Sequence, residues 1–370
     1  MKSILLITHD TSLTGAPKSL LLVFEKIVKQ KLDFDTTTIA LKGRGKLEER
    51  FQQLSSHYFR LDTLSNKKVY TLNKRLNRKI FNTPILSDYE CFINDICSSH
   101  FDFIYCNTIV SLSIASLFKE RLHSKLILHI HELKTVIDEF YPQLNTKDEC
   151  IDLYIVPSEL NKSCLIDDFN IPPNKIHIIR ETSDIVGNSI FSNKVNSSYN
   201  ILMCGGAYWR KGDDLFVLIA NSILKQDNRY RFYWVGYQSE ERKRVNNADL
   251  VKLGIQDYVT FIDETDNPLN WDIQSDAFML TSREDPFPLA AIEAGILGLP
   301  IFCFDKATGI SEVINTFCVI PYLDTELMAN SIIEVFNNRK LYNQLSNENI
   351  ALFSNFTPQN ISNEIFKLLQ

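Results

Sequence analysis

The chain lacks any long hydrophobic run. Across its 370 residues, the apolar segments near the start, residues 4–7 and 20–24, are followed at once by polar or charged side chains. A membrane-spanning helix needs about 20 apolar residues, and a secretory signal also needs a longer apolar stretch than these. We therefore expect a cytoplasmic protein.

The sequence also lacks a metal-binding cysteine pattern and a strong charge of either sign. Its eight cysteines form no C-x-x-C pair, so we interpret them as buried thiols in a reducing compartment. The formal net charge is −6 and the pI is about 5.7, which gives no global signature of nucleic-acid binding. We expect neither a metal site nor a nucleic-acid partner.

What the chain does contain is a repeated order of apolar strand, loop and helix. We predict strands at residues 3–8, 34–41, 101–106, 125–131, 153–156 and 175–179 in the first half, and at 200–204, 231–235, 259–262, 277–280 and 301–304 in the second. The predicted helices include residues 18–29, 159–169, 213–225, 325–337, 338–353 and 359–369. Strands that alternate with helices form βαβ units and parallel sheets.

This order predicts an α/β protein with two Rossmann-like, parallel-sheet domains that face an inter-domain cleft. The polar segment before residue 198 predicts a linker, so we expect an N-terminal domain at residues 1–182 and a C-terminal domain at 198–353. Residues 354–370 are expected to form a helix that packs back on the N-terminal domain. Ligands of such sheets bind beyond the carboxyl ends of the strands, so those loops should carry the chemistry.

One stretch is strongly basic. Residues 63–87 contain six basic side chains and no acidic one, namely Lys67, Lys68, Lys74, Arg75, Arg78 and Lys79. Apolar residues at 72, 76 and 80 give this stretch one hydrophobic helical face. Three interpretations stay open: a basic helix on an anionic membrane or acceptor surface, an ordinary solvated helix, and, more weakly, a nucleic-acid contact.

Two strand-end loops of the first half carry polar groups. In residues 9–19, Gly15 and Ala16 let the backbone approach a ligand where a helix N-terminus can bind an anion, although a simple tight turn fits as well. This loop has no G-x-G-x-x-G fingerprint, which disfavours a nicotinamide or flavin cofactor. In the second loop, His129 and His131 precede Glu132. They would contact a sugar or phosphate, ligate a metal, or simply be satisfied at the strand end.

Two loops of the second half carry stronger patterns. Residues 205–212 read Gly-Gly-Ala-Tyr-Trp-Arg-Lys-Gly, and glycines beside cations suit a diphosphate, with a solvated glycine turn as the alternative. Residues 282–294 join a strand to a helix, with Asp285 before the helix and Glu293 within it. A carboxylate can accept two adjacent sugar hydroxyls, whereas an acid before a helix can also simply complement the helix dipole.

The order of these loops resembles the retaining GT-B glycosyltransferases of family 4, the glycosyl transferases group 1. The resemblance runs through nearly the whole chain. Its best carriers are Arg-Lys-Gly at residues 210–212, Asp-Pro-Phe-Pro-Leu at 285–289 and Glu-Ala at 293–294. The paired acids of that family are usually both glutamate with seven residues between them, a spacing that Asp285 and Glu293 keep.

The resemblance implies a role for each site residue. Glu293 would hold the ribose hydroxyls of a nucleotide, and backbone at residues 261–264 would read its base. The expected catalytic residues are Lys211 on the diphosphate, Asp285 on the donor sugar and His131 on the sugar side. The other expected donor-binding residues are Gly15, Ala16, Gly205, Arg210, Phe287, Leu289 and Ala290.

Three positions depart from the family pattern. An arginine often follows the glycine that ends the first strand of the second domain, and that position is Gly206 here. Arg210 is the candidate substitute, although as a neighbour of Lys211 its side chain need not face the same ligand. Pro286 stands where many members have glycine, so one amide donor is missing. Asp285 is one methylene shorter than the usual glutamate.

The resemblance implies a retaining, metal-independent transfer of a sugar from a nucleoside-diphosphate sugar to an acceptor hydroxyl. A UDP-sugar is favoured over a GDP-sugar, and no other cofactor is implied. The acceptor would be a lipid-linked or growing glycan of bacterial surface polysaccharide (capsule, O-antigen), handled at the inner face of the cytoplasmic membrane. A GT-B-fold nucleotide-sugar epimerase and a catalytically weak sugar-nucleotide-binding partner protein are the alternatives.

Overall fold

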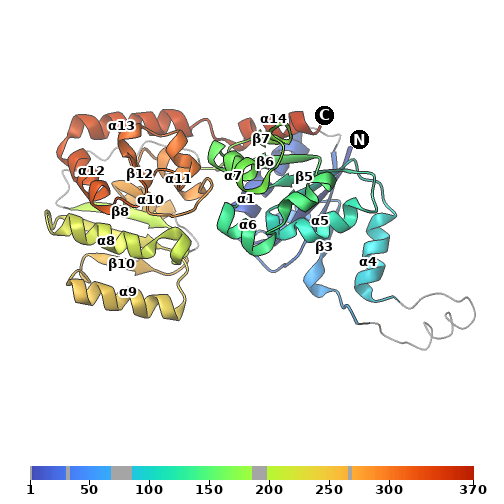
Figure 1. Cartoon of the computed structure of the whole chain (residues 1–370), viewed down its shortest axis with the longest axis horizontal. Helices are drawn as coiled ribbons and strands as arrows, with labels where there is room; N and C mark the ends of the chain where they lie inside the picture. The colour runs from blue at the N-terminus through green and yellow to red at the C-terminus, as the bar shows by residue number, and fades with distance from the viewer. Residues whose placement is uncertain (1, 31–33, 68–85, 186–197, 266–268) are drawn as a thin grey trace, which may run out of the picture. The chain divides into compact units, whose positions relative to one another are not determined.

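The computed structural model describes residues 2–30, 34–67, 86–185, 198–265 and 269–370. The chain divides into two compact units. The first consists of Met1–Val156, Leu165–His177 and Ser362–Gln370, and the second of Pro157–Cys164 and Ile178–Ile361. The division falls inside helices α7 (Glu159–Phe169) and α14 (Pro358–Leu368) (Figure 1). Among the described residues, no helix has the length and apolarity that a membrane crossing requires.

The first unit is built on a seven-stranded sheet in the order β3-β2-β1-β4-β5-β6-β7. Among the described residues, β1 pairs in parallel with β2 and β4, β2 with β3, β4 with β5, and β5 with β6. Residues 4–7 of the central strand β1 are fully buried, as expected for a strand that is covered on both faces. The strands are β1 (Lys2–Thr8), β2 (Phe34–Ala40), β3 (His57–Arg60), β4 (Phe103–Asn107), β5 (Lys125–His129), β6 (Leu153–Val156) and β7 (Ile176–Ile178).

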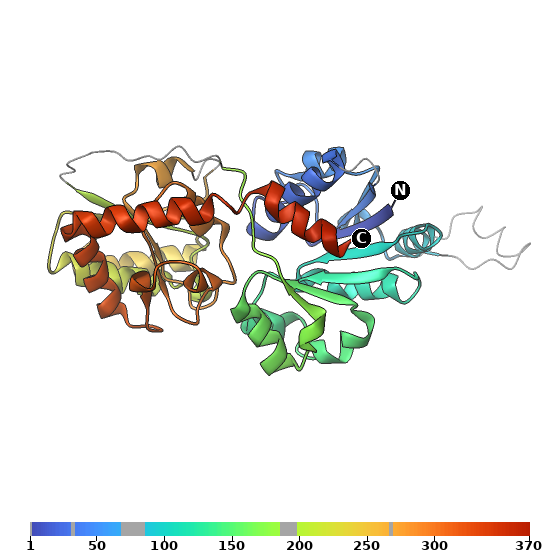
Figure 2. The same cartoon turned by 90° about the horizontal axis from the view of Figure 1, so that it is seen from above.

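Helices connect these strands, and the two chain ends meet beside β1 and β2. The Lys2 ammonium donates to the Leu369 carbonyl at 2.7 Å, and the rings of Phe34 and Phe366 lie 5.7 Å apart (Figure 2). The connecting helices are α1 (Gly15–Gln30), α2 (Glu48–Leu54), α4 (Asp88–Cys97), α5 (Leu112–Lys119), α6 (Lys134–Phe140) and α7.

The second unit is built on a six-stranded parallel sheet in the order β10-β9-β8-β11-β12-β13. Its strands are β8 (Tyr199–Cys204), β9 (Tyr230–Val235), β10 (Val259–Ile262), β11 (Ala277–Leu280), β12 (Ile301–Phe304) and β13 (Val319–Ile320). Its helices are α8 (Asp213–Leu224), α9 (Glu240–Leu253), α10 (Leu269–Gln274), α11 (Leu289–Ile296), α12 (Thr325–Asn337) and α13 (Arg339–Phe353).

Helices cover both faces of this second sheet. From β8 the chain steps through α8 and α9 toward β10, and from β11 it steps through α11 the opposite way toward β12. Because parallel crossovers are right-handed, the two directions place these helices on opposite faces. The packing agrees: α8 packs against α9 and α12, while α11 packs against α10 and α13 (Figure 1).

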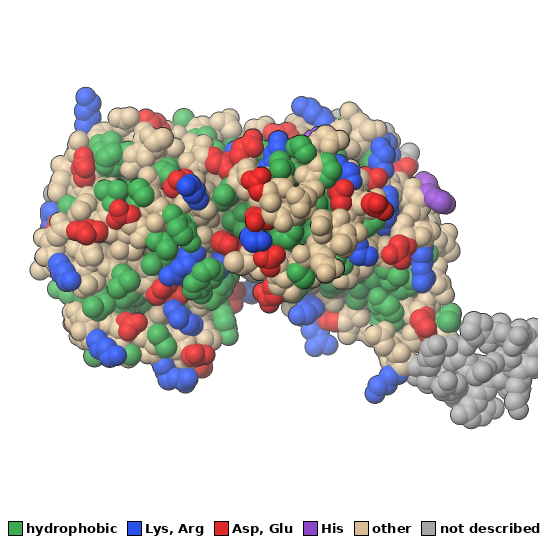
Figure 3. All heavy atoms as spheres, viewed as in Figure 1, with side chains coloured by type: hydrophobic (Ala, Val, Ile, Leu, Met, Phe, Trp, Pro, Cys, Tyr) green, Lys and Arg blue, Asp and Glu red, His purple; other side chains and the backbone are tan. Residues whose placement is uncertain are grey.

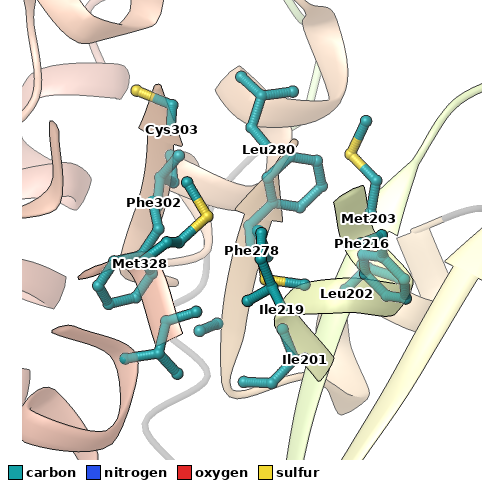
Figure 4. Packing of buried hydrophobic residues seen from close by; sticks show 14 of the residues in the cluster. Ile201, Leu202, Met203, Phe216, Ile219, Phe278, Leu280, Phe302, Cys303 and Met328 are labelled. Carbon is teal, nitrogen blue, oxygen red and sulfur yellow. The ribbon is translucent and has the colours of Figure 1, made fainter. Parts of the chain in front are cut away.

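The core of the second unit lies between the sheet and these helices. Figure 4 shows apolar side chains of β8, β11 and β12 packed together with residues of α8 and α12, all of them at most 1% exposed. Burying one such side chain contributes about 1.5–3 kcal/mol. The labelled residues are Ile201, Leu202, Met203, Phe216, Ile219, Phe278, Leu280, Phe302, Cys303 and Met328.

The predicted α/β fold with two parallel sheets is confirmed. Strands β6, β10, β11 and β12 and helices α7 and α12 have the predicted bounds. Helix α7 begins after Ser158. The Ser158 hydroxyl accepts a hydrogen bond from the backbone amide of Asn161 at 3.1 Å, as the side chain of an N-cap residue does.

The basic stretch stays a prediction. Lys67 is exposed, whereas the other five basic residues lie outside the described residues, as does most of the predicted linker. On the face drawn in Figure 3, basic and acidic side chains are interspersed over each unit.

Candidate functional site

Two strand-end loops of the second unit are joined through their backbones. The amides of Arg283 and Glu284 donate to the Arg210 carbonyl at 2.8 and 3.3 Å. The Thr281 hydroxyl donates to the Lys211 carbonyl at 3.1 Å. The loops that follow β8 and β11 therefore form one structure, because these strands are neighbours in the sheet.

Three charged side chains converge within this structure. The Lys211 ammonium pairs with Asp285 Oδ2, and the Arg210 Nη1 atom lies 3.8 Å from Asp285 Oδ1. Asp285 is 4% exposed, and the Ser282 hydroxyl also donates to it at 3.2 Å. Two cations and one carboxylate thus share a confined place, in which charge interactions are stronger than in water.

Gly212 makes the close approach of the two loops possible. Its φ of +73° is in the left-handed region that glycine favours. A Cβ at this position would lie 2.1 Å from the Thr281 carbonyl oxygen, so no side chain fits here. Gly205, in the same loop, accepts a hydrogen bond from the buried Trp234 indole at 2.7 Å.

A third loop, which follows β12, supports the Asp285 backbone. The Asp285 amide donates to the Ala307 carbonyl, and the Gly309 amide donates to the Pro286 carbonyl, both at 2.8 Å. The Pro286 carbonyl thus helps to join this loop to the loop that follows β11. Pro286 has no N–H to donate to a ligand.

Glu293 lies on α11, apart from the group around Asp285. It is 7% exposed, and the Ser183 hydroxyl donates to its Oε1 at 3.1 Å. Asp272 on α10 interacts with it electrostatically: burial and the Glu293 charge raise the pKa of Asp272 to about 8. Burial, with the charges of Asp272 and Glu293, also raises the pKa of the nearby Cys204 thiol. Asp272 is therefore largely protonated at neutral pH.

The remaining donor-loop residues offer backbone groups. The Phe287 side chain is buried against Phe356 and the Arg180 guanidinium, so only its main chain can meet a ligand. Leu289 and Ala290 form the first turn of α11, which has no acidic residue. Amides of a helix's first turn have no intrahelical acceptor and favour an anion.

In the first unit, Asn107 contacts both Ala16 and His131. Asn107 was not singled out from the sequence. The Asn107 side chain donates to the Ala16 carbonyl at 3.1 Å, and its Oδ1 lies 2.8 Å from His131 Nε2. Gly15 begins α1 immediately before Ala16. The ring of His129 lies against that of His131, with the two centroids 4.0 Å apart, and its Nδ1 lies 2.8 Å from the Tyr105 hydroxyl.

His9 is a second polar residue at this sheet edge that was not assigned from the sequence. Its Nδ1 lies 3.4 Å from the Thr108 hydroxyl and its Nε2 3.4 Å from Asp10. Burial lowers the pKa of His9, while Asp10 opposes that effect. Thr108 has a φ of +75°, a strained value for a threonine. The signal in the sequence was that polar residues end each apolar run: Asn107 and Thr108 come directly after residues 103–106, and His9 and Asp10 come directly after β1.

Comparison with known families finds a similarity that lies mostly within the second unit. Residues 188–351 match the family described as "Glycosyl transferases group 1". The matched range covers most of the second unit. A curated relative from Haemophilus influenzae, called an uncharacterized glycosyltransferase, is 27% identical over 168 residues, which are 44% of this chain and 47% of that protein. The match therefore spans about half the length of that relative.

Solved structures resemble the chain over its full length. Anabaena HepE in complex with UDP has a TM-score of 0.79 at 16% identity and covers 100% of this chain and 99% of its own. A mutant of S. aureus TarM in complex with fondaparinux, alpha-GlcNAc-glycerol and UDP has a TM-score of 0.74 at 13% identity, with 100% of both chains covered. The lipopolysaccharide outer core galactosyltransferase WaaB has a TM-score of 0.73 at 14% identity, with 99% of both chains covered.

These likenesses confirm the two-domain α/β fold of GT-B glycosyltransferases. Together with the domain match and the curated relative, they support a role in glycosyl transfer.

Proposed function

We propose that the chain is a retaining glycosyltransferase of family 4 that transfers a sugar from a UDP-sugar to an acceptor hydroxyl without a metal ion. The observation that carries the proposal is the convergence of Lys211, Arg210 and Asp285 at the strand ends of a glycosyl transferases group 1 domain. UDP is favoured because HepE was solved with UDP, with UDP-glucose, and with UDP and glucose.

The paired charges suit a diphosphate and a sugar together. On binding, Lys211 and Arg210 would exchange part of their attraction to Asp285 for the diphosphate oxygens. Asp285 would then accept hydroxyls of the donor sugar, and Glu293 would accept the two ribose hydroxyls. Preorganised cations at a leaving group stabilise the charge that develops as its bond breaks.

The resemblance to the retaining GT-B glycosyltransferases implies a front-face reaction at this site. The acceptor oxygen forms a bond to the anomeric carbon on the face from which the diphosphate leaves. The bond from that carbon to the phosphate oxygen breaks, and the acceptor proton passes to the leaving diphosphate. The configuration at the anomeric carbon is retained. In the first unit, His131 and the backbone at Gly15 and Ala16 would contact the sugar and phosphates.

The acceptor that we propose is a lipid-linked or growing glycan of bacterial surface polysaccharide, used at the inner face of the cytoplasmic membrane. The support is the basic sequence of residues 67–79. Flotation of the protein with vesicles that contain anionic phospholipid tests the membrane part. Binding at low salt that falls as salt rises supports it, and no binding at low salt contradicts it.

The donor part is tested with UDP-sugars and GDP-sugars by measuring nucleotide release and, by NMR, the anomer of the sugar that is formed first. We expect UDP release and retention of configuration. Lys211→Ala and Glu293→Ala should lower turnover strongly, while Lys243→Ala should not, because Lys243 is a surface lysine paired with Asp263. Unchanged turnover in the first two variants, or an inverted product, contradicts the proposal.

A further inference from the structure

The space beside Gly206, in the loop that follows β8, is occupied by the ring of another residue. A Cβ built on Gly206 would lie 2.5 Å from Cε1 of Tyr208, so the Tyr208 ring fills the space that a side chain at 206 would need. Tyr208 has an extended backbone and is 42% exposed. The ring therefore lies on the glycine at the site surface instead of in the core.

The same ring contacts Arg210. The guanidinium carbon lies 5.7 Å from the centroid of the Tyr208 ring, and Nη2 donates to the Tyr208 hydroxyl at 3.3 Å. On its other side, Nη1 donates to the Glu284 carbonyl at 2.7 Å. These contacts fix the guanidinium beside Asp285, where the Lys211 ammonium also lies.

We propose that Tyr208 is a positioning residue that aims Arg210 at the diphosphate, so that Arg210 and Lys211 together select a nucleoside diphosphate over a monophosphate. The inference rests on the proposed function, because it needs a diphosphate in this site. Arg210 has five N–H groups, and Glu284 and Tyr208 take two of them, which leaves donors for phosphate oxygens. A second phosphate brings a further charge, and a planar guanidinium can bind it through two parallel hydrogen bonds.

The test is calorimetric titration of the full chain with UDP and with UMP. Tyr208→Ala should weaken the binding of UDP roughly tenfold and that of UMP less than about twofold. The reason is that a misdirected charge-assisted hydrogen bond lowers the affinity by about one power of ten. Tyr208→Phe keeps the ring and should stay within about threefold of the wild type. Arg210→Gln should lose at least as much UDP affinity as Tyr208→Ala. Tyr237→Ala is the matched control, because Tyr237 is 62% exposed in the loop after β9.

A double substitution separates positioning from a general structural effect. Gly206→Ala should displace the ring and weaken UDP binding as Tyr208→Ala does. In the Tyr208→Ala background, Gly206→Ala should add nothing, because the ring that it displaces is gone. The inference is overturned if the wild type binds UDP and Tyr208→Ala leaves the UDP-to-UMP ratio unchanged, or if Gly206→Ala has the same effect in both backgrounds. A wild type that binds neither UDP nor GDP would overturn the proposed function first, and this inference with it.

Discussion

The buried carboxyl of Asp272 gives the sharpest prediction about the second unit. Asp272 is 2% exposed, and its Oδ1 accepts no hydrogen bond from the described part of the chain. Burial, followed by the Glu293 charge, raises its pKa from 3.8 to about 8. We therefore expect Asp272→Asn, which keeps the shape but cannot ionise, to make the second unit more stable at neutral and alkaline pH.

The direction in which the free energy of unfolding changes with pH follows from the number of protons that the folded and the unfolded chain bind. Between about pH 4 and pH 8 the folded protein holds a proton on Asp272 that the unfolded chain has lost, so the free energy of unfolding falls as pH rises through that window. A shift of this size corresponds to about 1.4 kcal/mol for each pKa unit, or about 4 kcal/mol between pH 5 and pH 8. Water that enters the site lowers the cost of burying the charge, so we expect about half of this change in the free energy of unfolding.

The assay can report on the second unit alone. All three tryptophans of the chain, Trp209, Trp234 and Trp271, lie in that unit. Urea unfolding followed by tryptophan fluorescence at pH 5, 6, 7 and 8 therefore gives its stability without the first unit. The stability difference between Asp272→Asn and the wild type should grow steadily with pH.

An exposed acid supplies the control. Asp263 has a side chain that is 65% exposed and is paired with Lys243, so Asp263→Asn should give a difference that hardly changes with pH. If the Asp272→Asn difference were also constant from pH 5 to pH 8, the carboxyl would not be protonated in the folded protein, and the reasoning about the Glu293 pair would be refuted.

Three further predictions concern the same unit. Glu293→Gln should lower the pKa of Asp272 in a carbon-13 NMR titration but leave it above 3.8, since burial is the larger cause; no change would show that the two groups do not interact. Gly295→Ala should cost about 1–3 kcal/mol in the fluorescence assay, because its Cβ would lie 2.1 Å from the Phe353 ring, and a neutral result would show that the helices can separate freely. Gly254→Ala meets no atom within 4 Å and should cost only about 1 kcal/mol, from its φ of +70°; a loss as large as that of Gly295→Ala would contradict this.

Elements with a strong apolar pattern could be predicted from the sequence, and those without one could not. Strand β11 and helix α7 were bounded correctly because an apolar run and an N-cap mark them. Strand β3 is four residues long and only partly buried at the edge of its sheet, so it has no apolar run. Helix α9 buries only Asn246 and Leu250 among its 14 residues, so its sequence shows no apolar face.

The site was predictable as a set of loops but not as a set of contacts. The spacing of Asp285 and Glu293 indicated a pair of acids. In the structure Asp285 lies beside two cations, whereas Glu293 accepts a hydrogen bond from a serine. Arg210 and Lys211 are neighbours whose side chains need not meet, yet both approach Asp285. The short turn at Trp209–Lys211 presents both residues, and the Tyr208 ring lies against Arg210. No periodicity in the sequence predicts either feature.

Contacts of Arg283 join the loops that follow β8 and β11, in addition to the backbone hydrogen bonds between them. Arg283 makes two hydrogen bonds to Asp214, donates to the Trp209 carbonyl and lies over the Trp209 ring. With the backbone bonds from Arg283 and Glu284 to Arg210, this keeps the turn that presents the cations in place even when no ligand offsets their charge. The carboxylate of Asp285 offsets that charge in the free protein. Cations placed by backbone contacts need little rearrangement when an anion arrives, and little rearrangement is what electrostatic stabilisation of a leaving group requires.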